Sequence, residues 1–146
     1  MDDPNRLDSI IKLADQKKSD AGRDLKYARN QQIQDQQQLK QLQDFYDEYL
    51  RQFKQATSIG MNARQLSDFR TFLNNLESAI SQKNQQLMQA DSRVEERRDE
   101  WRGKHQHSEM LADYQGKLSH QNIVKNTRRE QKEVDDRPPG NSHSPR

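Results

Sequence analysis

A seven-residue repeat of apolar side chains fills two long stretches of this 146-residue chain and is broken once between them. In the first stretch the apolar positions alternate in steps of four and three, which is the spacing of a coiled-coil seam. Only Lys18, Gln32 and Asp35 interrupt it with polar side chains. The repeat predicts one long helix that buries a narrow stripe. Its seam positions are Leu7, Ile11, Ala14, Ala21, Leu25, Ala28, Leu39, Leu42, Tyr46, Tyr49, Phe53 and Ala56.

The break in the repeat lies at residues 57–62. Gly60 can adopt the left-handed conformation that ends helices. Asn62 is a favourable N-cap, and Gln65 follows three residues later in a capping-box position. A second heptad pattern then runs through an unbroken first series of apolar residues, while its other series turns basic at Arg97 and Lys104. The sequence therefore predicts a turn followed by a second long helix.

Two long helices joined by a short loop pack against each other as an antiparallel hairpin. We predict an all-α fold, a long two-helix antiparallel coiled coil over residues 1–134. Its helices are expected at about residues 4–57 and 63–130, with a loop at about 58–62. The turn-rich tail, residues 135–146, is expected to be disordered. Aromatic residues gather near the loop, so that end should be better packed than the end with both termini.

Composition limits the possible functions. Only 29% of the residues are hydrophobic, too few for an ordinary globular core, whereas a net charge of +2 argues against disorder driven by charge. Acidic and basic residues are interleaved, so no one-signed surface for nucleic acid is expected. The acidic N-terminus does not resemble a signal peptide, and no stretch is apolar enough to span a membrane. We expect a cytoplasmic protein that reaches a membrane only through a partner.

The chain lacks the residue patterns of enzymes and metal sites. It contains no cysteine, and its five glycines are scattered, which excludes thiolate chemistry and a glycine-rich phosphate loop. His105 and His107 are two residues apart and face different directions on a helix, whereas a metal pair requires a spacing of four. We therefore predict no catalytic residue, no cofactor and no metal.

A second stripe of residues accompanies the seam near the loop. Phe45 and Phe72 lie off the inner seam, at positions where a two-helix coil does not need aromatic side chains. They either widen the apolar contact within the hairpin or form an exposed patch that docks a partner. The stripe comprises Gln38, Leu42, Phe45 and Tyr49 on the first helix, and Phe72, Leu76, Ala79 and Lys83 on the second.

The segments LQDFYDEYLRQF (residues 42–53) and FRTFLNNLESAISQKNQQL (residues 69–87) resemble the FliJ family. Gly60 lies between the two segments and Trp101 follows them, and the resemblance covers roughly residues 5–120. It implies a small component of the bacterial flagellar type III export apparatus. Proteins of this family are antiparallel coiled coils similar to the central stalk subunit of rotary ATPases.

The resemblance also implies partners. These are the hexameric ring of the flagellar export ATPase, the cytoplasmic domain of the export gate protein, and the export chaperones, at the inner membrane of the flagellar base. Family members couple export to the proton motive force. Phe45 replaces a familiar Tyr, and Lys83 replaces a familiar His. The implied gate-binding residues are Gln38, Leu42, Phe45, Tyr49, Phe72, Leu76 and Ala79.

Two alternatives to the flagellar function remain open from the sequence. The same stalk mechanics serve virulence type III secretion systems, whose stalk proteins share the hairpin. A generic coiled-coil scaffold needs neither an ATPase nor a gate. The stripe near the loop favours the flagellar assignment.

Overall fold

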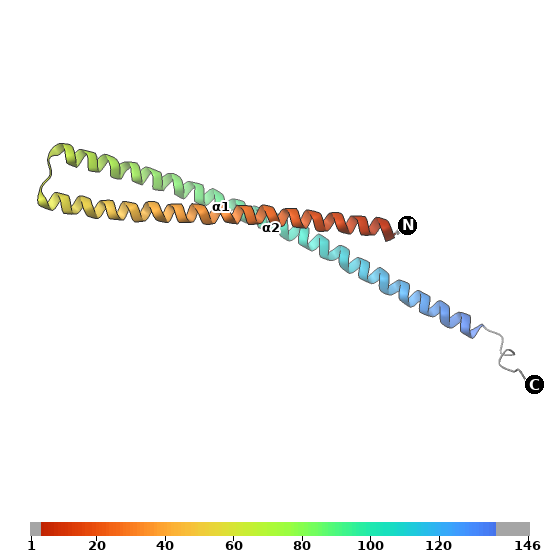
Figure 1. Cartoon of the computed structure of the whole chain (residues 1–146). Helices are drawn as coiled ribbons and strands as arrows, with labels where there is room; N and C mark the ends of the chain where they lie inside the picture. Colours follow the sequence, from red (N-terminus) through yellow and green to blue (C-terminus); the bar gives the residue numbers. More distant parts are fainter. Residues whose placement is uncertain (1–3, 137–146) are drawn as a thin grey trace, which may run out of the picture. The chain divides into compact units, whose positions relative to one another are not determined.

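The computed structural model describes residues 4–136. They form two helices, α1 (Pro4–Ile59) and α2 (Ala63–Asp135), joined by a short connection at residues 60–62 (Figure 1). The predicted all-α fold is confirmed over this part of the chain. The sequence placed the helix ends near residues 57 and 130, and helix α2 continues five residues beyond that estimate. Most of the tail that we expected to be disordered, residues 137–146, lies outside the described residues.

The connection between the helices has the predicted turn chemistry. Gly60 has a φ of 109°, which is costly for residues with a Cβ, and its N–H donates to the carbonyl oxygen of Ala56 at 3.1 Å. The Gln65 N–H donates to Asn62 Oδ1 at 2.8 Å, and the Asn62 N–H donates to Gln65 Oε1 at 3.4 Å. This reciprocal pair is a capping box, so it fixes where α2 begins.

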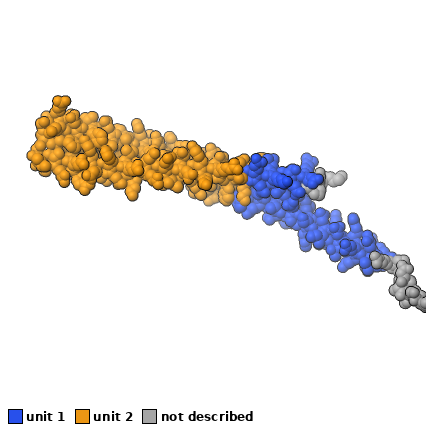
Figure 2. Space-filling view, viewed as in Figure 1, with its two compact units in different colours: residues 1–16, 104–146 blue, residues 17–103 orange. Residues whose placement is uncertain are grey.

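The chain divides into two compact units, coloured separately in Figure 2. We call residues 17–103 the hairpin unit, and residues 1–16 with 104–146 the terminal unit. Within the hairpin unit the Gln32 amide donates to Asp91 at 2.7 Å, and further along α1 the Tyr46 hydroxyl donates to Glu77 at 2.8 Å. Residue numbers rise on α1 while they fall on α2, so the two helices are antiparallel there, as predicted.

The heptad seam accounts for the burial in the hairpin unit. Every predicted seam position between Lys18 and Trp101 is buried or half-buried. Side-chain burial along this stripe removes apolar surface from water, which is the main stabilising contribution available to a two-helix structure. The fully buried apolar residues of this unit are Ala21, Leu25, Ala28, Leu39, Leu73, Leu76, Ala90 and Val94.

Within the hairpin unit the best-buried residues lie away from the loop, and the expectation that the loop end is better packed than the end with both termini stays a prediction. The lowest exposed fraction in the unit is 1% at Ala90, and a core cluster forms around Leu25 and Val94, with Trp101 packed against it. The aromatic seam residues near the loop are half-buried. Small side chains are covered completely by a facing helix, whereas large rings extend past the line of contact. Close approach also occurs at Gly22, where an added Cβ would lie 3.4 Å from the indole nitrogen of Trp101.

The terminal unit repeats the antiparallel arrangement with a more polar seam. Ala14 and Ser108 are buried. The Ser108 hydroxyl donates to Asp15 Oδ1 at 2.6 Å, and the Gln115 amide donates to Asp8 Oδ1 at 2.8 Å. Lys104, assigned to the seam from the sequence, is exposed. A long charged side chain at a seam position can turn outward and keep its ammonium hydrated.

Candidate functional site

The stripe singled out from the sequence lies on both helices of the hairpin unit, close to the connection. We call the seven residues of this stripe other than Lys83 the aromatic stripe. Their spacing of four, three and four on α1, and of four and three on α2, places each set along one helix face. The members are Gln38, Leu42, Phe45, Tyr49, Phe72, Leu76 and Ala79.

Three aromatic rings join the two halves of this stripe. The ring of Phe72 lies 4.3 Å from that of Tyr49 and 6.2 Å from that of Phe45, centroid to centroid, the latter in an edge-to-face arrangement. Tyr49 also contacts Phe69 at 5.0 Å, and Phe69 contacts Phe53 at 5.6 Å. These separations are those of favourable aromatic pairs. The rings therefore hold the two helices together and also hold one another in fixed orientations.

Packing does not remove these rings from solvent. Phe45 is 54% exposed and Phe72 is 37% exposed, although both contact other aromatic side chains. Gln38 is exposed, Leu42, Tyr49 and Ala79 are half-buried, and Leu76 is buried. The rings thus widen the apolar contact within the hairpin and still present apolar surface to solvent, and the docking of a partner on this surface stays a prediction. Leu76 belongs to the inner seam rather than to the accessible surface.

An open hollow of about 480 Å³ lies beside Phe45. The aromatic stripe supplies four of the eight residues that line it. Three of the remaining residues are glutamines that the sequence interpretation missed, because a glutamine on a coiled-coil flank looks like ordinary solvated surface. The lining comprises Gln38, Gln41, Leu42, Phe45, Ala79, Gln82, Lys83 and Gln86.

Lys83, at the edge of this hollow, is held by the opposite helix. Its ammonium donates to Asp35 Oδ1 at 3.1 Å and to Gln86 Oε1 at 3.1 Å. The side chains of Lys83 and Asp35 are only 15% and 18% exposed, so this is a largely buried ion pair between helices. Both residues interrupt the apolar seam in the sequence, and they carry opposite charges. Antiparallel packing of the helices brings the two charges together.

A second polar link lies on the same unit. The Tyr46 hydroxyl donates a hydrogen bond to the carboxylate of Glu77, and this bond, together with partial burial and the negative charges of Glu77 and Asp47, raises the pKa of Tyr46 above 10.0. This link connects the helices one turn from the aromatic rings.

Residues 4–136 contain neither a candidate metal site nor a candidate membrane span. No group of three or more His, Cys, Asp or Glu side chains within this range is placed to hold a metal ion. Within the same range, neither helix contains a stretch long and apolar enough to cross a membrane.

Comparison with known proteins adds two findings. The sequence model of a family described as "Flagellar FliJ protein" matches residues 3–137. The chain is also similar to the flagellar FliJ protein of Escherichia coli (strain K12), with 30% identity over 130 residues. That alignment covers 89% of this chain and 88% of the relative.

Proposed function

Because the chain belongs to the FliJ family, a component of the flagellar export apparatus, we propose that it acts there by binding partner proteins through the aromatic stripe. The proposed partner of this surface is the cytoplasmic domain of the export gate protein. The observation that carries the proposal is Phe45, a large apolar ring that is 54% exposed beside an open hollow.

The chemistry of this surface suits a partner that inserts an apolar side chain. Aromatic rings fixed by neighbouring rings lose little conformational freedom when a partner covers them, so more of the burial energy appears as affinity. The hollow beside Phe45 offers space for such a side chain. Side-chain amides of Gln38, Gln41 and Gln82 line it and can donate or accept hydrogen bonds. Seven of the eight residues that line the hollow are uncharged, and the ammonium of Lys83 pairs with Asp35, so binding in the hollow should depend weakly on salt.

The wider function that we propose follows the family resemblance. The protein binds the hexameric ring of the flagellar export ATPase as a stalk-like coiled coil, and it binds the export chaperones. It thereby couples the ATPase to the gate during protein export. It has no catalytic role of its own, and it associates with the inner membrane at the flagellar base through these partners.

Gate binding is tested with three forms of the full chain: wild type, Phe45→Asp and Ile33→Asp. Ile33 is a matched control on the same helix, because it is 48% exposed and lies outside the aromatic stripe. Isothermal titration with the cytoplasmic domain of the cognate gate protein should show affinity reduced by at least about 30-fold for Phe45→Asp, roughly 2 kcal/mol, as for a central hot spot. Ile33→Asp should bind like wild type.

The outcome that contradicts gate binding through the stripe is equal affinity for the two aspartate variants and the wild type. Phe72→Asp is a less suitable variant, because its ring packs against Tyr49 and its loss also perturbs the hairpin. The ATPase part of the proposal is measured separately, as ATP hydrolysis and hexamer formation by the cognate export ATPase with and without this protein. Stimulation supports the stalk role, and no effect from a folded sample favours a simple scaffold.

A further inference from the structure

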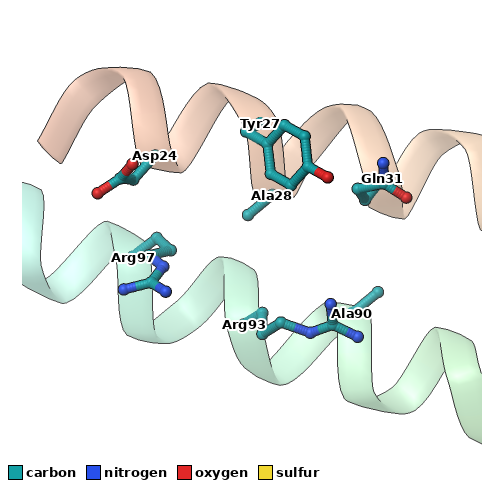
Figure 3. Close-up of a pocket in the computed structure, with 7 residues that line it drawn as sticks. All are labelled: Asp24, Tyr27, Ala28, Gln31, Ala90, Arg93 and Arg97. Atoms are coloured by element: carbon teal, nitrogen blue, oxygen red, sulfur yellow. The ribbon is translucent and has the colours of Figure 1, made fainter. Parts of the chain in front are cut away.

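A second hollow lies in the hairpin unit, away from the aromatic stripe. It has a volume of about 200 Å³, whereas a single water requires roughly 10–15 Å³ on the same kind of measure, so a side chain of a partner fits there. Figure 3 shows that its lining comes from α1 and α2 in comparable parts. The residues are Asp24, Tyr27, Ala28, Gln31, Ala90, Arg93 and Arg97.

The hollow exists because the seam beneath it is built from alanines. Ala28 and Ala90 are both buried and contribute only methyl groups, which fill the contact between the helices but nothing above it. The longer side chains of Tyr27, Arg93 and Arg97 rise around this floor (Figure 3). Tyr27 is 67% exposed, so its ring forms a wall that solvent reaches.

One arginine of the lining, Arg93, carries a positive charge that pairs with no acidic side chain of the described range. Arg97 and Arg98 each form an ion pair with a glutamate three residues away on α2. Arg93 forms no ion pair or hydrogen bond with any residue of the described range, and its side chain extends along α2 towards Ala90 in Figure 3. A guanidinium presents a fork of donors that matches a carboxylate in two parallel hydrogen bonds. Arg93 is therefore a ready partner for an incoming acid.

We propose that this hollow binds an acidic peptide segment of a partner protein, with a carboxylate on Arg93 and an apolar stem against Tyr27. Gln31 can donate an amide hydrogen to the same acid, and Asp24 at the other end can accept an N–H from the peptide backbone. In Figure 3, Asp24 and Arg97 lie at one end of the hollow, and Arg93 and Gln31 lie towards the other, so the end proposed for the carboxylate is the one without an acidic lining residue.

The neighbouring charges favour a short acidic peptide over a nucleic acid. Arg93 and Arg97 are surrounded in the sequence by Asp91, Glu95 and Glu96. An extended phosphate backbone needs a continuous basic surface, and these carboxylates beside the arginines on α2 would repel it. One or two carboxylates can enter between them.

The test is a nuclear magnetic resonance titration of the full chain with an acetyl-capped tetraglutamate peptide. Saturable shifts are expected at the side-chain N–H groups of Arg93 and Arg97 and at the Tyr27 ring. Arg93→Gln should weaken the affinity about tenfold, the effect of losing a charge-assisted hydrogen bond. Arg102→Gln, at an exposed arginine outside the hollow, should change it less than about twofold. Arg93 is exposed, so far-ultraviolet circular dichroism should show unchanged helicity in both variants.

Three outcomes would overturn the proposal. Shifts spread equally over Arg102 and the other exposed arginines would mean nonspecific attraction of an anion. Equal binding of a tetraglutamine peptide would mean that charge is irrelevant. Tighter binding of an oligothymidine strand at the same arginines would assign the hollow to nucleic acid. Because Phe45→Asp should leave the tetraglutamate titration unchanged, failure here and failure of gate binding are distinguishable.

Discussion

The aromatic end of the hairpin unit and its alanine-lined segment share one heptad seam but differ in what they expose. At the aromatic end, Phe45 and Phe72 contact other rings and remain accessible to solvent. In the alanine-lined segment, Ala28 and Ala90 are buried, and the space above them is hollow. Large rings beside the seam thus create a projecting apolar surface, and small residues within the seam create a recess with polar walls.

The difference follows from having only two helices. A third layer of structure would cover rings that extend past the seam, as in the core of an ordinary globular domain. Here such rings remain partly exposed to solvent. A partner that covers them therefore gains the free energy of burying their apolar surface. The same geometry makes burial in the hairpin unit a poor guide to binding, because the best-buried residues are aliphatic side chains of the seam, whereas the rings that a partner can reach are only partly covered.

The largest effect that separates the two regions should come from placing the same charge in each. Val94→Asp introduces a carboxylate into the cluster formed with Leu25 and Ala28, where it cannot be hydrated. It should lower the free energy of unfolding by about 3 kcal/mol or more. Phe45→Asp, at an exposed ring, should cost about 1 kcal/mol or less. Urea denaturation followed by circular dichroism measures both.

Val94→Ala serves as the control for size. It removes two methyl groups without adding charge and should cost roughly 1–2 kcal/mol, less than Val94→Asp. If Phe45→Asp instead destabilises the protein as strongly as Val94→Asp, Phe45 belongs to the core. The aromatic end would then be as much a part of the core as the alanine-lined segment.

The helices, the turn and the seam were accessible from sequence because each depends on local chemistry. Gly60 and Asn62 act through their own backbone and caps, and the heptad spacing requires only a partner helix. Lys104 was wrongly assigned to the seam, since a long charged side chain can leave a heptad position without disturbing it. Leu76 fits both the seam and the stripe in the sequence pattern, and its burial assigns it to the seam.

The two hollows could not be predicted, because they depend on which residues face each other across the helices. Ala28 and Ala90 are separated by sixty-two positions, obtained by subtracting their residue numbers, and their pairing requires the exact register of the hairpin. The ion pair between Asp35 and Lys83 has the same origin. A register shift of one heptad would preserve the apolar pattern but would lose both hollows and the ion pair.

The next effect in size concerns this ion pair, which lies between the two regions along both helices. Removing one partner, as in Asp35→Leu or Lys83→Leu, leaves the other charge largely covered and should cost about 2 kcal/mol of unfolding free energy. The double variant Asp35→Leu/Lys83→Leu removes both charges and should regain most of that loss, because apolar residues suit a seam. Urea denaturation of the four forms gives the coupling energy.

We expect the Asp35–Lys83 ion pair to fix the register in which the two helices pack. A polar pair at one seam position can select a register at a cost in stability. If the double variant is as unstable as either single variant, the positions cannot accept apolar packing, and the pair stabilises the hairpin rather than selecting its register.

The smallest effect concerns pH and the link between Tyr46 and Glu77. The hydrogen bond to Glu77 raises the folded-state pKa of Tyr46 above its usual value, so its contribution to stability is complete below about pH 10. As the pH rises through the raised pKa, the phenol loses its proton, the bond is lost, and two negative charges face each other across the helices. The stability difference between wild type and Tyr46→Phe should therefore be constant from pH 6 to about pH 9 and shrink above pH 10. Glu77→Gln removes the main cause of the raised Tyr46 pKa. The free energy of unfolding of this variant should therefore change less above pH 10 than that of the wild type. A difference that grows with alkalinity would show that the link forms with the ionised phenol, contrary to the direction of the pKa shift.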